Sequence, residues 1–245
     1  MIAPDSFISH LMELRDRLVR SLIAVGLVFV CLFPFASQLY DLLASPMMHA
    51  LPEGTKMIAT GVVTPFFVPV KITLMVALLI AMPILLYQTW AFVAPGLYTH
   101  EKKLVLPLVI ASTLLFVLGI AFCYFFVFGV VFKFIYTIAP KSITVAPDIE
   151  NYLNFVLGMF LSFGITFEVP IVVIVLVRMG MVSIQKLKDV RPYFVVGAFI
   201  VAAVVTPPDV LSQIMLAVPL CLLYELGIFV SRFVTPGGEA AKTQS

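Results

Sequence analysis

Residues 151–177 read NYLNFVLGMFLSFGITFEVPIVVIVLV, and this stretch decides the fold. As a helix rising about 1.5 Å per residue, its part 152–177 is long enough to cross the roughly 30 Å hydrocarbon core of a bilayer. Near its middle stands one carboxylate, Glu168, and an ionised Glu at that depth costs about 2.5 kcal/mol or more. We therefore expect Glu168 to face protein or water, in a polar recess that other membrane helices build.

The composition is that of an integral membrane protein. Of the 245 residues, 62% are hydrophobic and 11% are charged, and the mean hydropathy is +1.14. Such values lie well outside the averages of soluble proteins. The three Cys and three His show no metal-ligand spacing, and no phosphate-binding loop or nucleophile motif occurs. We therefore predict that the chain is not an enzyme, holds no cofactor or metal, and binds no nucleic acid.

Six apolar segments are expected to cross the membrane within a single domain, 1–234, followed by a disordered cytoplasmic tail, 235–245. The expected spans are 21–40, 70–92, 104–132, 152–177, 192–206 and 210–230. The fifth and sixth have uncharged stretches of only 17 residues (192–208) and 15 residues (210–224). These are short against the roughly 20 residues that a bilayer requires, so we expect local thinning of the membrane there. The predicted fold class is an all-α membrane protein with six transmembrane helices and a concave polar face.

The basic residues predict the orientation of the chain. An even number of spans places both termini on one side, and that side collects eleven of the 15 Lys and Arg residues. Cytoplasmic loops carry an excess of these residues. Both termini are therefore predicted to be cytoplasmic.

Several stretches resemble the TatC family, the largest subunit of the twin-arginine translocase, which exports folded proteins. They are HLMELRDRL (10–18), SPMMHALPEG (45–54), MIATGVVTPFF (57–67), QTWAFVAPGLYTHEKK (88–103), SFGITFEVP (162–170), VRPYFVVGAF (190–199) and VVTPPDVLSQ (204–213). Each is weak alone, but they arrive in the family's order and the resemblance covers roughly 7–233.

The resemblance implies a receptor in the bacterial cytoplasmic (inner) membrane. The family binds signal peptides that carry two adjacent arginines, on its cytoplasmic face. Its partners are the single-span subunits TatA and TatB, and we expect a homo-oligomer within the complex. The energy is expected to come from the proton gradient. An ion-coupled secondary transporter that uses Glu168 is the alternative function, although the paired broken helices typical of such transporters are not evident.

The resemblance also implies which residues bind the signal peptide. Glu13 and Glu101 are expected to receive the arginines, whose planar fork of donors suits carboxylates. Phe92 is expected to pack against the apolar residue that follows the arginine pair. Each has a plainer alternative: Glu13 is four residues before Arg17 and suits a helix-surface ion pair, Glu101 suits the first turn of a helix, and Phe92 suits the membrane interface.

Other positions match the family with less defined roles. Arg17 and Arg15 match basic positions of the N-terminal helix and are expected to shape the site. Pro46, in the first outer loop, matches a position important for transport.

Three polar residues near or within the later spans are expected to contact a partner's membrane helix. They are Glu168, Asp209 and Gln213. For Glu168 the alternative is a structural hydrogen bond to a neighbouring span. For Asp209 an ordinary helix cap after Pro207 and Pro208 is at least as plausible.

Overall fold

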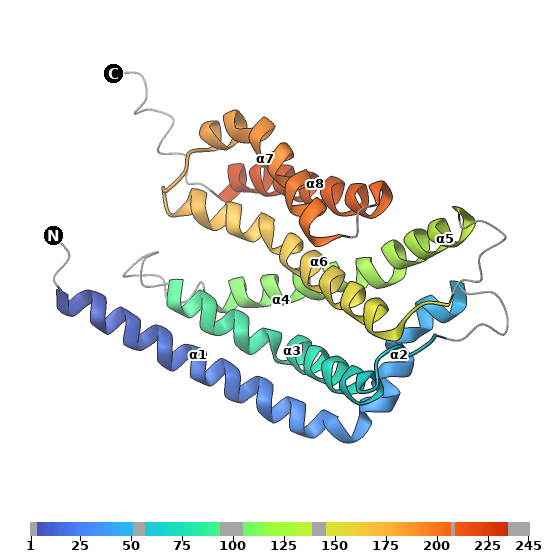
Figure 1. Cartoon of the computed structure of the whole chain (residues 1–245). Coiled ribbons are helices and arrows are strands. Elements are labelled where there is room, and N and C mark those ends of the chain that lie inside the picture. The colour runs from blue at the N-terminus through green and yellow to red at the C-terminus, as the bar shows by residue number, and fades with distance from the viewer. Residues whose placement is uncertain (1–3, 51–56, 94–104, 139–145, 207–208, 235–245) are drawn as a thin grey trace, which may run out of the picture. The chain divides into compact units, whose positions relative to one another are not determined.

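The computed structural model describes most of the chain (Figure 1). The described residues are 4–50, 57–93, 105–138, 146–206 and 209–234. Within these ranges every regular element is a helix, and the one β contact is an isolated bridge between Ile58 and Asp148. The predicted all-α membrane fold is confirmed.

The helices divide between two compact units, which we describe separately. The first unit comprises residues 1–114 and 128–157, and the second comprises 115–127 and 158–245. The helices are α1 (Pro4–Leu32), α2 (Ala36–Ala50), α3 (Thr64–Val93), α4 (Val105–Phe122), α5 (Phe128–Ile138), α6 (Ile149–Arg178), α7 (Ile184–Val205) and α8 (Val210–Val234).

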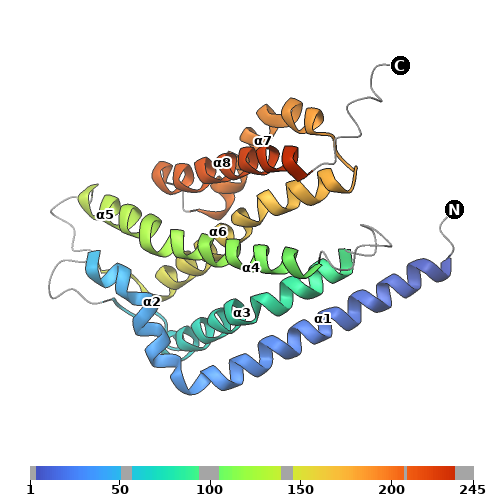
Figure 2. The same ribbon diagram turned by 180° about the vertical axis from the view of Figure 1, so that it is seen from behind.

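In the first unit, α1 runs along α3 in both views (Figures 1 and 2). Residues 4–20, which precede the span expected at 21–40, form one continuous helix with the first part of that span, because no breaker interrupts the helix before Pro34. Pro34 lies in the short 3-10 turn Phe33–Phe35, where its missing N–H ends the α-helical hydrogen bonding. After this turn α2 packs against α3 and α5.

Five helical segments are long and apolar enough to cross a membrane. They are Ile8–Ser45, Thr64–Val93, Leu106–Ile135, Ile149–Arg178 and Val210–Phe233. The third contains a π-helical turn, Cys123–Val127, between α4 and α5. The helix α7 begins at Ile184, eight residues before the span expected at 192–206, and its first turns are charged. Only its second half is therefore apolar.

The outer end of the first unit is held by a polar network around the start of α6. Asp148 caps this helix, since its Oδ1 accepts hydrogen bonds from the backbone N–H groups of Glu150 and Asn151, both at 3.0 Å. Its Oδ2 accepts from Thr60, from Oγ1 at 2.7 Å and from the backbone N–H at 3.1 Å. Beside it, Lys71 Nζ of α3 donates to Glu150 at 2.9 Å. The network fastens the segment before α3 to the start of α6.

The Asp148 contact predicts a pH dependence of stability. Hydrogen bonds, above all the one from the Thr60 side chain, lower the pKa of Asp148. The stabilisation is therefore complete above the unfolded-state pKa of about 3.9, and it is lost as the pH falls through the lower folded-state pKa. We expect Asp148→Asn to lower the unfolding temperature at pH 7, and the difference from the parent to shrink below about pH 4. Thermal unfolding between pH 7 and pH 3 measures this, and a difference independent of pH would contradict it.

In the second unit, glycines let helices pack closely. A Cβ at Gly119 of α4 would lie 2.6 Å from the carbonyl oxygen of Phe163, and one at Gly164 would lie 2.5 Å from the ring of Phe116. Small residues serve this purpose in membrane proteins, where close van der Waals packing drives helix association. The helices α4 and α6 therefore approach at backbone distance.

The helices α7 and α8 lie side by side in the second unit (Figures 1 and 2). The ring of Phe194 stacks on that of Tyr224 with centroids 3.8 Å apart, and Tyr224 Oη donates to the carbonyl oxygen of Leu187 at 2.8 Å. Arg191 Nη2 pairs with Glu225 at 2.5 Å. These contacts hold α7, whose apolar part is short, against α8.

Candidate functional site

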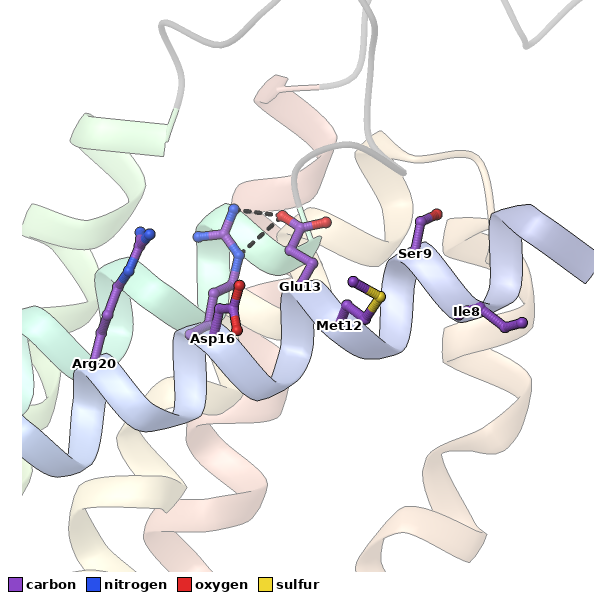
Figure 3. Close-up of a pocket in the computed structure, with 7 residues that line it drawn as sticks. Ile8, Ser9, Met12, Glu13, Asp16 and Arg20 are labelled. Atoms are coloured by element: carbon purple, nitrogen blue, oxygen red, sulfur yellow. Dashed lines mark hydrogen bonds and ion pairs between the residues drawn. The ribbon is translucent and has the colours of Figure 1, made fainter.

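One face of α1 forms an open pocket of about 580 Å³ near the N-terminus (Figure 3). Its lining residues recur every three or four positions, as the helical repeat requires. They are Ile8, Ser9, Met12, Glu13, Asp16, Arg17 and Arg20. Figure 3 shows Glu13 and Arg20 extending from the same side of the helix, with Asp16 between them. The pocket thus combines two carboxylates, two guanidinium groups and apolar side chains.

The central contact of the pocket joins Glu13 to Arg17. Arg17 Nε and Nη2 both donate to Oε1 of Glu13, at 3.0 and 2.6 Å. Arg17 Nη1 donates to Oε1 of Gln88, on α3, at 3.3 Å. The side chains of Glu13 and Arg17 are 37% and 20% exposed. Glu13 and Arg17 therefore form the helix-surface ion pair that the sequence offered as the plainer alternative. Gln88 of α3 adds one further hydrogen bond to Arg17.

Phe92 reaches the same region through a ring contact. It stacks on His10 of α1, with ring centroids 4.2 Å apart and an angle of 14° between the planes. His10 Nδ1 lies 3.8 Å from Oε2 of Glu13. The structure therefore brings together three of the residues that the sequence nominated, Glu13, Arg17 and Phe92.

The remaining nominated residues at this end are placed differently. Arg15 pairs with its neighbour Asp16, with Nη2 to Oδ1 at 2.8 Å, and both side chains are more than half exposed. It makes no contact with Glu13 among the described residues. Glu101 lies outside the described residues, as does the whole segment 94–104.

Chemically, this arrangement is a site for a guanidinium group. Carboxylates bind arginine through charge-assisted hydrogen bonds, and Arg17 already directs two of them at one oxygen of Glu13, Oε1. The second oxygen, Oε2, makes no hydrogen bond among the described residues and has only the 3.8 Å approach of His10. Because Glu13 is partly exposed, its carboxylate remains reachable by a second cationic group.

Sequence reasoning missed Gln88 and His10. His10 is three residues before Glu13, so helical spacing alone could have nominated it. Gln88 is 71 residues from Arg17 and carries no charge. Only the packing of α1 on α3 identifies it.

Glu168 lies in α6, two residues before the helix-internal Pro170. Both of its carboxylate oxygens are buried within the protein. The protein therefore covers the carboxylate, as expected for an acid within a membrane span. Its contact with a partner helix stays a prediction.

The other two nominated residues of the second unit stabilise the start of α8. Asp209 Oδ1 accepts a hydrogen bond from the backbone N–H of Ser212 at 2.7 Å, which is the N-cap arrangement that the sequence offered as the alternative. Gln213 Nε2 donates to the carbonyl oxygen of Phe199 in α7 at 3.2 Å. In the first unit, Pro46 lies within α2 rather than in a loop. The expectation that Pro46 lies in a loop is therefore wrong: proline removes one backbone donor, but its φ is compatible with a helical backbone.

Known proteins resemble this chain along almost its full length. The family model for the Sec-independent protein translocase protein TatC matches residues 9–219. A protein of that name from Halothiobacillus neapolitanus is 53% identical over 227 residues, 93% of this chain and 62% of the relative's length. One from Escherichia coli K12 is 49% identical over 231 residues, 94% of this chain and 90% of the relative.

A solved structure agrees with the fold. It is described as the crystal structure of the twin arginine translocase receptor TatC, and it matches with a TM-score of 0.82 and 40% identity over 93% of this chain and 100% of the other. The family match and these identities together show that the chain belongs to the TatC family of Sec-independent protein translocase proteins.

Proposed function

We propose that this chain is the signal-peptide receptor and core subunit of a twin-arginine translocase. The observation that carries the proposal is the convergence of Glu13, Arg17 and Phe92 beside the pocket of α1, in a chain of the TatC family. The resemblance assigned Glu13 and Phe92 to signal-peptide binding, and Arg17 to the shape of the site, independently of their distances. In this proposal the chain is a binding protein rather than an enzyme, and it binds folded precursor proteins by their signal peptides.

In this proposal the arginine pair of a signal peptide docks on carboxylates at the cytoplasmic end of the chain. Glu13 receives one guanidinium, and Glu101 is assigned to the other by resemblance. Phe92 offers an aromatic face, held by its stacking on His10, to the apolar residue that follows the pair. A planar guanidinium fork suits this docking better than an ammonium group.

The single-span subunits TatA and TatB are proposed to pack along α7 and α8, within an assembly that holds more than one copy of this chain in the bacterial cytoplasmic membrane. The short apolar part of α7 supports local thinning of the bilayer there. Thinning would lower the barrier to the passage of a folded cargo. The proton gradient is the proposed source of energy.

Glu168 is proposed to contact a partner helix or the inserted signal peptide. Because both carboxylate oxygens are covered in the isolated chain, this contact requires the Glu168 side chain to change rotamer or its covering residues to move. Hydrogen bonds between polar side chains of neighbouring helices contribute to helix association in membranes. Asp209 and Gln213 are proposed to bind the same partner at the outer rim, in addition to stabilising α8.

Capture of a signal peptide tests the proposed function. We expect membranes containing the chain to bind a two-arginine signal peptide and to bind its two-lysine counterpart much more weakly. The double variant Glu13→Ala, Glu101→Ala should abolish the difference. If the double variant held the two-arginine peptide as tightly as the parent, the binding assignment would be wrong. An ion-coupled transporter, the alternative function, would show no such capture.

A further inference from the structure

The carboxylate that is proposed to receive a signal-peptide arginine already holds an arginine of its own chain. Arg17 directs Nε and Nη2 at one oxygen of Glu13, at 3.0 and 2.6 Å. Its remaining nitrogen, Nη1, is 3.3 Å from Oε1 of Gln88. All three nitrogens of this guanidinium are thus engaged, and its side chain is only 20% exposed. Arg17 is a well-held occupant rather than a passing surface contact.

We propose that Arg17 is an internal competitor that occupies Glu13 until a signal-peptide guanidinium displaces it. The inference rests on the proposed function, and it concerns how tightly that site binds. Arg17 and the incoming arginine present the same chemical group to the same carboxylate. The cost of releasing Arg17 therefore offsets part of the binding free energy that the peptide gains at Glu13, which helps the peptide to leave again.

The second oxygen of Glu13 offers a route for this exchange. Oε1 carries both hydrogen bonds from Arg17, whereas Oε2 has only the 3.8 Å approach of His10 Nδ1 among the described residues. An incoming guanidinium can bind Oε2 first, while Arg17 still holds Oε1. The carboxylate therefore never has to lose one cation before it gains the next.

Gln88 gives the displaced side chain somewhere to stay. A guanidinium that loses its carboxylate while partly buried suffers a desolvation cost unless other acceptors remain. The Gln88 carbonyl oxygen, on α3, is such an acceptor. It keeps Arg17 beside the site, ready to occupy Glu13 again when the peptide leaves.

Competition has a thermodynamic signature that a supporting role lacks. An internal occupant raises the dissociation constant of every peptide that needs Glu13, by the same factor, whatever that peptide carries. Removing the occupant must therefore tighten binding. If Arg17 instead held Glu13 in a productive orientation, removing it would weaken binding. The sign of the change separates the two roles.

The test is a binding series on the full-length protein in nanodiscs with a fluorescently labelled two-arginine signal peptide. A partly exposed ion pair is worth a factor of about two to five in binding. We expect Arg17→Gln to lower the dissociation constant by about that factor. Arg17→Lys, which keeps the charge but loses the planar fork, should fall between the parent and Arg17→Gln.

Arg20→Gln is the matched control, because Arg20 lines the same pocket and its loss removes the same charge without freeing Glu13. The proposal requires Arg17→Gln to tighten binding more than Arg20→Gln does. Equal tightening by both would reduce the effect to net charge and overturn it, and so would weaker binding by Arg17→Gln. Failure of the proposed function looks different, since the parent would then not bind the two-arginine peptide or Glu13→Gln would bind it unchanged.

Discussion

Glu13→Gln is expected to weaken binding of a two-arginine signal peptide by about tenfold or more. The amide keeps the size and one acceptor oxygen of the side chain, but it loses the charge-assisted hydrogen bonds, which are worth about 1.5–3 kcal/mol, or roughly ten- to 150-fold. The change also leaves the Arg17 guanidinium without its carboxylate beside the docking site. Its unpaired positive charge would then repel the incoming arginines.

The matched control for this prediction is Glu225→Gln. Glu225 also forms an ion pair with an arginine, Arg191 of α7, and both side chains are between 40% and 50% exposed. This variant removes an equivalent carboxylate from the second unit. Peptide binding measured by fluorescence anisotropy should be lost in Glu13→Gln and retained in Glu225→Gln. Similar losses in both variants would mean that net charge, and not the pocket of α1, controls binding.

Glu168→Ala is expected to reduce crosslinking to a partner's membrane helix by about three- to tenfold, on the scale of one hydrogen bond within a membrane. Capture of the signal peptide at the cytoplasmic end should remain within about twofold of the parent, since Glu13 and Phe92 are untouched. The measurement is crosslinking yield per copy in membranes, with peptide binding determined on the same preparations.

Ser162→Ala provides a control on the same helix. Ser162 Oγ donates to the carbonyl oxygen of Gly158, four residues earlier in α6, so its loss removes a polar group that serves its own helix. It should leave both crosslinking and peptide capture intact. If Glu168→Ala lost both functions equally, together with a lower unfolding temperature, Glu168 would be a structural residue of α6 and the recess proposal would fail.

The sequence predicted those features of the site that depend on local spacing. Glu13 and Arg17 are four residues apart, so any helix through them places the two side chains on one face. The burial of Glu168 also followed from one free energy, because placing an ionised carboxylate in hydrocarbon costs more than most single contacts contribute. Asp209 before the first turn of α8 was recognisable as a cap.

Other features depend on which helices pack together, and residue spacing does not record that. Gln88 and Phe92 join α1 only because α3 lies along it, and neither residue carries a charge that would reveal the pairing. The start of α7 at Ile184 was not predicted, because only the uncharged span at 192–206 was considered and the charged residues before it were left unassigned. The cap at Ser183, whose side chain accepts from the Lys186 backbone N–H, was the available signal.

The most direct test of the account is site-specific photocrosslinking from the pocket of α1 in membranes. A photoreactive amino acid at Met12, which lines the pocket, should form an adduct with residues flanking the arginine pair of a signal peptide. The adduct should disappear with a two-lysine peptide and in Glu13→Gln, and a photoreactive group at Ile58, on the segment fastened to the outer start of α6, should form none. A two-arginine peptide that is captured normally yet reacts at Ile58 and never at Met12 would contradict the account.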